Sequence, residues 1–298
     1  MKNILDGKGT RATAGGVFSF KTVIILIVLG AFSFSAYFVL AGFASDLRST
    51  NNGGEHALSK SAIGFAGLVH ILKENGQSVS ITREPAYRRA DKRKLKIITV
   101  PVGFFPVALD EIEFKQPTLI VLPKWQTRPM PGHKGWVRKL NAPNKPIVPV
   151  GRISQKLTPI TGEIEITRSN KDSERVHIQP ANRDTDSAEY QIFNFENLQT
   201  IDGKNLLPIY ITDQGPVLAQ VKDSQTFILS DPDFMNTHSI TKSTIAAFAD
   251  NIVNRIQEKT GTRDVVFDLS LHGFTGSQNL IKLALTAPFL GATLALLA

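Results

Sequence analysis

The segment Thr226–Ile256 reads TFILSDPDFMNTHSITKSTIAAFADNIVNRI, and its pattern is the strongest indication of fold class in this sequence. Its first part, Phe227–Leu229, is an apolar run of strand length that a proline soon closes. Its last part has apolar side chains at the i, i+3, i+4 and i+7 spacing of a helix with one buried stripe, namely Ile245, Phe248, Ala249, Ile252, Val253 and Ile256. Gly261 is positioned to end this helix, and Val265–Phe267 is typical of another buried strand. Strand, helix and strand in this order predict a βαβ unit in an α/β domain with a mostly parallel sheet.

An acidic turn, Asp231-Pro232-Asp233, lies between the strand and the helix. It follows the carboxyl end of the strand, which is where ligands bind in open α/β sheets. The sequence therefore predicts where a ligand would bind, but it names no biochemical activity.

The composition excludes several classes of site. The 298 residues include no cysteine, which rules out disulfides, zinc-thiolate sites and cysteine nucleophiles. The net charge of +8 comes from lysines and arginines that are dispersed along the chain, with two local clusters at residues 83–96 and 134–145. Nucleic-acid binding needs a continuous basic face with interleaved aromatic side chains, and Tyr87 is the one aromatic residue beside the first cluster. A solvated loop or a contact with anionic lipid headgroups fits that cluster better, so no nucleic-acid partner is expected.

The amino-terminal segment predicts a membrane anchor. After a polar, positively charged tail at residues 1–21, Thr22–Ala44 runs for 23 residues without a charge. As a helix this run would extend roughly 34 Å, enough to cross a hydrocarbon core of about 30 Å. The positive tail predicts a cytoplasmic amino terminus and, after a linker at residues 45–55, an exported main domain that is periplasmic or extracellular. The alternative is a signal peptide cleaved near Gly42-Phe43-Ala44, but its apolar region would exceed the usual length of about 7 to 15 residues.

The carboxyl-terminal segment Leu280–Ala298 predicts a second membrane helix. Sixteen uncharged residues follow Lys282, fewer than the roughly 20 that a crossing needs, so the sequence leaves open whether this helix is complete or truncated. Together, the two segments would hold both ends of a domain at residues 56–277 against one membrane face.

The first half of that domain predicts alternating helices and strands. His56–Glu74 predicts a helix that Ser59 or Ser61 caps and Gly76 ends. Gly64 and Gly67 each weaken a helix by about 1 kcal/mol relative to alanine, so we expect them to pack closely against a neighbouring backbone. The remaining patterns predict strands at Val79–Ile81, Ile97–Val100, Thr118–Leu122 and Ile147–Val150 and a short helix at Trp136–Leu140.

The second half predicts an antiparallel β insertion at residues 157–216. Its apolar residues alternate with polar ones, as in Glu163–Thr167, Val176–Ile178, Tyr190–Phe193 and Ile209–Thr212, and turn residues separate these runs. The α/β core then resumes at Val217–Val221.

Three segments resemble the bacterial membrane family described as domain of unknown function 4350. They are Ser61–Leu68, Ser230–Asp233 with Asn236 and the later Asp250-Asn251, and Val266–Asp268 followed by Leu271-His272-Gly273. The order of a membrane helix, an exported domain and a second helix is also similar. The resemblance implies a class I glutamine amidotransferase-like, flavodoxin-like fold and an association with MoxR-type AAA ATPase systems. This chain has Leu269 where many relatives carry an acidic residue.

The sequence contains few candidates for catalytic residues. A glutaminase needs an activated cysteine and is excluded. A serine hydrolase of the Gly-x-Ser-x-Gly kind lacks its motif here, although Ser230 could act with His238 or His272 as its base.

The acidic turn has two interpretations. Asp231, Asp233 and Asp268 could hold a hard cation through oxygen ligands. Alternatively, the first two cap the turn and the amides of the following helix, which is a common use of aspartate and the interpretation that we favour. We likewise expect Asp250-Asn251 to tie its helix to the turn by hydrogen bonds, and His272 to be a structural contact rather than a titrating group.

The sequence thus favours a membrane-anchored, non-catalytic interaction domain whose partners are a lipid bilayer and other membrane-associated proteins. The rival hypothesis is a ligand-binding, metal-binding or hydrolytic domain that uses the turn Ser230–Asn236. No cofactor is expected. The candidate binding residues are Ser230, Asp231, Asp233, Asn236, Asp250, Asn251 and His272.

Overall fold

The computed structural model describes residues 19–47, 52–83, 90–102, 115–140, 148–182 and 191–274. The chain divides into two compact units, one formed by residues 1–44 and 277–298 and the other by residues 45–276. The second unit is an α/β body and contains the candidate site.

In the first unit, the described structure is one long helix, α1 (Phe20–Leu47). Its large apolar side chains are exposed, among them Ile25, Ile27 and Phe32. Over the described part of the chain, no helix meets the combined length and hydropathy of a membrane crossing, so the predicted flanking membrane helices find no support there. The second predicted segment, Leu280–Ala298, lies outside the described residues.

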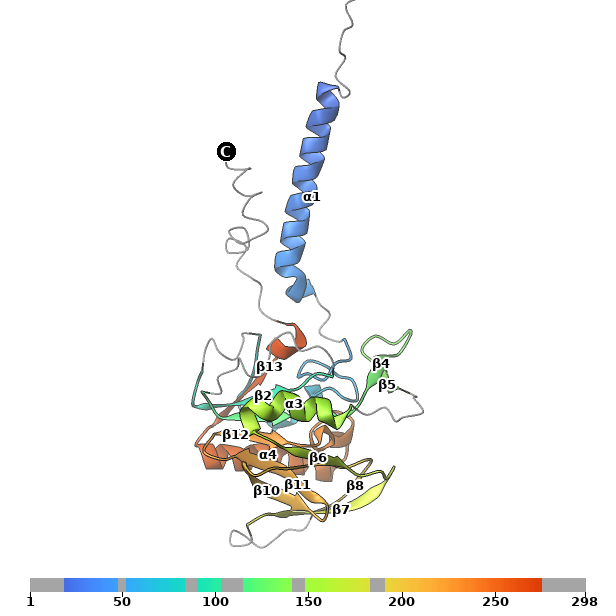
Figure 1. The fold of residues 1–298 in the computed structure, drawn as a ribbon. Helices are drawn as coiled ribbons and strands as arrows, with labels where there is room; N and C mark the ends of the chain where they lie inside the picture. Colours follow the sequence, from blue (N-terminus) through green and yellow to red (C-terminus); the bar gives the residue numbers. More distant parts are fainter. Residues whose placement is uncertain are drawn as a thin grey trace, which may run out of the picture. The chain divides into compact units, whose positions relative to one another are not determined.

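The body is organised around one nine-stranded sheet in the order β1-β13-β2-β3-β12-β11-β10-β7-β8 (Figure 1). Five adjacent strands are parallel: β1 (Val79–Thr82), β13 (Asp264–Asp268), β2 (Lys94–Thr99), β3 (Thr118–Val121) and β12 (Thr226–Leu229). The other four are antiparallel: β11 (Gly215–Val221), β10 (Leu206–Thr212), β7 (Glu174–Pro180) and β8 (Gln191–Phe195). The predicted mostly parallel sheet with an antiparallel part is therefore confirmed.

Two small antiparallel sheets accompany the large one. The strands β4 (Thr127–Pro129) and β5 (Val137–Lys139) form a hairpin, and β6 (Glu165–Arg168) pairs with β9 (Gln199–Asp202).

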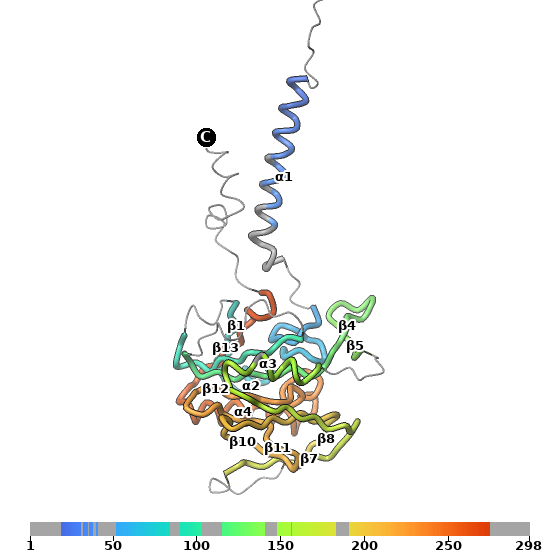
Figure 2. The backbone as a smooth tube through the Cα atoms, viewed as in Figure 1, coloured from blue at the N-terminus to red at the C-terminus, as the bar shows by residue number. Residues whose placement is uncertain are grey.

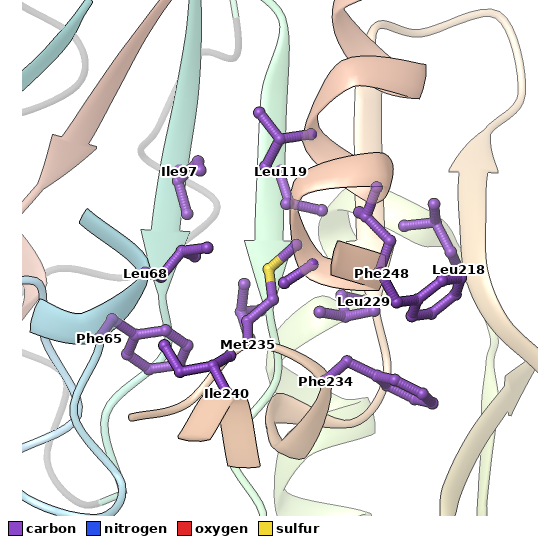
Figure 3. Close-up of a cluster of buried hydrophobic side chains, with 14 of the residues drawn as sticks. Phe65, Leu68, Ile97, Leu119, Leu218, Leu229, Phe234, Met235, Ile240 and Phe248 are labelled. Carbon is purple, nitrogen blue, oxygen red and sulfur yellow. The ribbon is translucent and has the colours of Figure 1, made fainter. Parts of the chain in front are cut away.

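Helices cover both faces of the large sheet. On one face, α2 (Ala66–Glu74) and α4 (Ser243–Thr260) lie side by side (Figure 2) and share a core with alternate residues of the parallel strands. Figure 3 shows part of this core, where Leu68 of α2 and Phe248 of α4 pack on the same side of the sheet as Ile97 and Leu119. On the other face, α3 (Val150–Thr161) packs on the intervening residues of the same strands. This two-sided burial explains why the central strands β3 and β12 are buried throughout and apolar after their first residue.

The opening stretch folds as its pattern predicts. All six stripe residues of α4 are buried, and each of the five that are larger than alanine contributes roughly 1.5–3 kcal/mol through burial. Gly261 ends the helix in the left-handed conformation with φ 70°, which glycine adopts without steric cost. The strands β12 and β13 flank α4 in the chain and are parallel, but β3 and β2 lie between them in the sheet.

Several predictions for the first half of the body are wrong. α2 begins at Ala66 rather than His56, because the chain before it forms turns in which the Ser61 hydroxyl donates to the Gly53 carbonyl instead of capping a helix. Trp136–Leu140 is not a helix; it contains β5, since it pairs with β4 across a glycine-rich turn. The strand expected to end at Val150 is absent from its described part, because Pro149 precedes the first turn of α3.

The antiparallel insertion also differs from its prediction. Its first residues belong to α3, so its strands begin at Glu165 rather than at residue 157. Most of its strands continue the parallel sheet through β11, which pairs with β12. The strand β9 was not predicted, because its four residues show no alternation long enough to detect.

Candidate functional site

Two strand ends meet at the carboxyl edge of the sheet. β3 pairs with β12 in register, with Val121 opposite Leu229, so Lys124 and Trp125 after one strand come beside the Asp231–Asp233 turn after the other. Ser230, Asp231, Asp233 and Asn236 therefore lie together, as the sequence predicts for a site at this edge.

Lys124 connects the two aspartates of the turn. Its ammonium group donates to Asp231 Oδ2 at 2.7 Å and to Asp233 Oδ2 at 2.8 Å. The Lys124 and Asp231 side chains have no exposed area, and that of Asp233 is 11% exposed. A buried lysine thus bridges two buried carboxylates.

The remaining carboxylate oxygens also have partners. Asp231 Oδ1 accepts from the Asp233 amide at 2.9 Å, and Asp231 Oδ2 accepts a further bond from the Gln199 amide at 2.9 Å. Asp233 Oδ1 accepts from the Trp125 indole at 2.7 Å and from the Asn236 amide group at 2.6 Å. The bond from the Asp233 amide to Asp231 Oδ1 caps the short helix Pro232–Phe234, as the capping interpretation of the turn predicts. All four oxygens are consequently occupied within the protein.

The charges of this cluster balance. Burial raises the pKa of Asp231 to about 6, while the Lys124 ammonium opposes the rise. Burial alone lowers the pKa of Lys124, but the two carboxylates outweigh it and raise that pKa above its usual value. Arg168 lies close enough to Asp231 for the carboxylate to act on it, although burial lowers the pKa of Arg168 to about 10. Two carboxylates thus face two cations, which removes the excess negative charge that a metal ion needs.

Ser230 is committed to the backbone. Its hydroxyl donates to the carbonyls of Gln199 at 2.6 Å and Val217 at 3.1 Å, and the residue is fully buried. His272 hydrogen-bonds instead to Thr99, and no hydrogen bond joins His238 to Ser230 in the described part of the chain. The serine therefore has no general base there.

A second polar cluster lies at the ends of β2 and β13. The ring nitrogen Nε2 of His272 is 2.9 Å from both the hydroxyl and the carbonyl oxygen of Thr99. The His56 ring meets it edge-on at 5.4 Å between centroids. Burial lowers the pKa of His56 to about 4, and burial together with His56 lowers that of His272 to about 3. Glu55 accepts the Val102 amide at 2.8 Å, and burial raises its pKa to about 7. His272 therefore stays neutral in the fold.

The other predicted site residues lie away from the turn. Asp250 accepts from Gln77 at 3.5 Å and from Asn254 at 3.2 Å, and Asn251 accepts from the Tyr210 hydroxyl. The expectation that this pair ties α4 to the turn is therefore wrong, because both side chains face other elements.

Asp268 is also separate from the turn. Its carboxylate lies 3.6 Å from the buried Lys96 ammonium, and it accepts the Ser270 amide at 2.8 Å. Among the described residues, no group of three or more acidic or histidine side chains is arranged to hold a metal ion.

A cavity of about 270 Å³ opens beside the cluster. Trp125, Asp233 and Asn236 line it, together with Lys139 and His238. The Lys139 ammonium lies 3.7 Å from the centre of the Trp125 ring, so a cation already covers this indole. Trp125 is thus a buried member of the cluster that also lines the cavity.

The sequence analysis missed Lys124, Gln199 and Glu55 as members of these clusters. Lys124 had a detectable signal, because it follows the most apolar strand at the same edge as the acidic turn. Gln199 and Glu55 had none, since Gln199 is the first residue of an unpredicted strand and Glu55 lies in a polar segment.

No protein-family model matches this chain, and no curated protein matches it either.

Proposed function

We propose that this chain is a membrane-anchored, non-catalytic α/β interaction domain, held outside the bacterial inner membrane and accessory to a MoxR-type AAA ATPase system. The single observation that supports a non-catalytic role is the bridge from Lys124 to Asp231 and Asp233. A carboxylate that acts as a base, nucleophile or metal ligand needs a free lone pair facing the substrate. Here, every oxygen of the two carboxylates accepts at least one bond from the protein itself, Asp231 has no exposed side-chain area and Asp233 is only 11% exposed, so neither presents an open lone pair to a substrate in solvent.

The membrane anchor is proposed from the charge-free stretch Thr22–Ala44. Exposed side chains of α1 such as Ile25, Ile27 and Phe32 would otherwise face water. The assignment to the family described as domain of unknown function 4350, and the flavodoxin-like fold with its two membrane helices, remain part of this proposal.

Fractionation and topology reporters test the anchor. We expect the intact chain to pellet with membranes and to require detergent for release. A reporter fused before Lys21 should be active in the cytoplasm, and one fused after Gly54 should be active outside it. An unprocessed chain in the soluble fraction, or a cytoplasmic signal from the second fusion, would contradict the proposal.

Affinity capture from detergent-solubilised membranes tests the partner. We expect membrane-associated proteins of a MoxR-type AAA ATPase system to copurify with the wild-type chain. The matched control is a chain that keeps the anchor but lacks the body, which should not retain those proteins that bind outside the membrane. Equal recovery with both chains would remove the body from the interaction.

A second candidate function is binding of a small ligand in the cavity beside Trp125. The observation that favours it is an open space of about 270 Å³ bordered by Trp125, Asp233 and Asn236. Asn236→Ala removes one polar wall without leaving Lys124 unpaired. If a ligand copurifies with the wild-type protein and is lost from this variant at unchanged melting temperature, the ligand-binding function replaces the interaction domain.

A further inference from the structure

The β4–β5 hairpin presents cations and an exposed indole together. From Gln126 to Leu140 the sequence has four lysines or arginines and no acidic residue. Trp136 is 62% exposed and Met130 is 38% exposed, although both belong to the turn region of the hairpin. The arrangement is unusual for a solvated loop, in which both charge signs are normally interspersed.

The hairpin holds Trp136 in place through the backbone. The Trp136 amide donates to the His133 carbonyl at 3.1 Å, and the Met130 amide donates to the Trp136 carbonyl at 2.9 Å. The His133 ring lies 5.3 Å from the indole. The exposed side chain is thus part of an ordered turn.

Arg128 and Arg138 are directly opposite each other in the hairpin. Residues in such a pair point to the same face with Cβ atoms about 5 Å apart, and like charges there destabilise the pairing. Among the residues that the structure describes, neither arginine has an ion-pair partner. Two guanidinium groups on one face can hold a phosphate between them, which converts the repulsion into binding.

The hairpin lies where the chain enters the body. A Cβ added to Gly53 would come within 2.6 Å of Val137 Cγ1, so the entering chain packs directly on β5. From Ala44 to Gly53 the chain advances nine residues, which reach at most about 32 Å. If Ala44 ends the proposed anchor, the hairpin stays within that distance of the bilayer surface.

We propose that the β4–β5 hairpin docks on the bilayer, with Arg128 and Arg138 on anionic lipid phosphates and Trp136 at the headgroup level. Indole side chains prefer this interface, and each basic side chain near an anionic surface improves binding about fivefold. Lys139 is not counted, because it pairs with Glu196 and covers Trp125. This inference rests on the proposed anchor.

The test uses the full chain in vesicles whose lipids carry bromine on the acyl chains near the headgroup. The chain has two tryptophans, and the other, Trp125, is buried, so the emission lost in Trp136→Phe belongs to the hairpin. We expect bromine to quench Trp136 in vesicles containing phosphatidylglycerol and far less in pure phosphatidylcholine. Raising the salt from about 0.1 M to about 1 M shortens the screening length from about 10 Å to about 3 Å and should release the hairpin.

The charge variant and its control complete the test. Arg128→Gln with Arg138→Gln should lower the docking equilibrium roughly thirtyfold. Arg152→Gln with Arg175→Gln removes the same charge from exposed positions elsewhere and should leave quenching unchanged. A chain that floats with vesicles while Trp136 is unquenched would overturn the docking but not the anchor; a hairpin that binds an acidic protein instead gives this result. A chain that does not float contradicts the anchor itself.

Discussion

Replacing Lys124 by methionine should reveal how strongly the Asp231–Asp233 turn depends on one buried cation. Methionine matches the length of the lysine stem and packs in the same space, so the change removes the charge with little change in volume. It leaves the Asp231 and Asp233 carboxylates without the donor that lies 2.7 Å and 2.8 Å away. Their other donors cannot replace it, because those are neutral amide and indole groups.

The expected loss of unfolding free energy is about 3–5 kcal/mol, the range for breaking a buried ion pair from one side. For a body of this size, that loss lowers the melting temperature by roughly 10 °C. The effect should depend on pH. The folded pKa of Asp231, about 6 in the wild type, rises further without the ammonium, whereas the unfolded value is 3.8. The stability of Lys124→Met is then highest below about pH 4 and declines as the pH rises through the folded pKa of Asp231. The loss of stability relative to wild type should therefore be smaller at about pH 5 than at about pH 8.

Urea denaturation followed by circular dichroism in detergent measures this loss. Lys139→Met is the matched control, because it breaks a half-exposed pair with Glu196 and should cost about 1 kcal/mol or less. Adding Asp231→Asn and Asp233→Asn to Lys124→Met should recover most of the stability by removing the unpaired charges. A loss below about 1 kcal/mol for Lys124→Met alone, without pH dependence, would refute the view that the turn is held by a buried charge bridge.

Three further predictions concern the fold and the second polar cluster. Gly64→Ala should prevent stable folding or greatly lower the melting temperature, because the new Cβ would lie 2.1 Å from the Ser59 carbonyl oxygen. Gly67→Ala should lower the melting temperature less, because its Cβ would meet the flexible end of the Ile240 side chain at 2.7 Å. Equal melting temperatures for the two variants would contradict this contrast. Burial raises the pKa of Glu55 from 4.5 to about 7, so the charged carboxylate opposes folding as the pH rises through this range. In urea denaturation, Glu55→Gln should be about 3 kcal/mol more stable than wild type at about pH 8 and equally stable near pH 4.5. Burial lowers the pKa of His56 from 6.5 to about 4, so its contribution to stability is present above pH 6.5 and is lost as the pH falls toward 4. His56→Gln should therefore lose less stability than wild type between about pH 7 and about pH 5. Parallel pH profiles of stability for the two proteins would show that His56 does not cause this pH dependence.

Several local features could be predicted from the sequence because a few adjacent residues cause them. The six apolar positions of α4 repeat at the period of a helix, and all six are buried against the sheet. The interior of β3 is apolar on both faces because α-helices cover both, and that continuous run is visible without any knowledge of the partners. A close backbone contact was expected at Gly64 and exists, but for a different reason, because Gly64 lies in a turn before α2 and approaches the Ser59 carbonyl; Gly67, within α2, meets the Ile240 side chain and not a backbone.

The errors arise where the same residues are compatible with two local structures. The apolar residues of Trp136–Leu140 do not repeat clearly at the period of a helix or of a strand. The segment forms a strand because it pairs with β4. The alternating runs after Glu165 predicted antiparallel strands, but no local pattern could say that β11 would join the parallel sheet beside β12. Pairing across long sequence separations depends on which edges are left open, and individual strands carry little information about that.

Residue types and their spacing along the chain are enough to predict a mostly parallel sheet, the βαβ order around α4, the absence of cysteine chemistry and the charge-free stretch near the amino terminus. The role of the acidic turn could not be predicted in this way, because it depends on Lys124, which is 107 residues away from Asp231 in the chain and 2.7 Å away in space. A carboxylate is a metal ligand, a base or a structural acceptor according to the donors that surround it, and the fold supplies those donors.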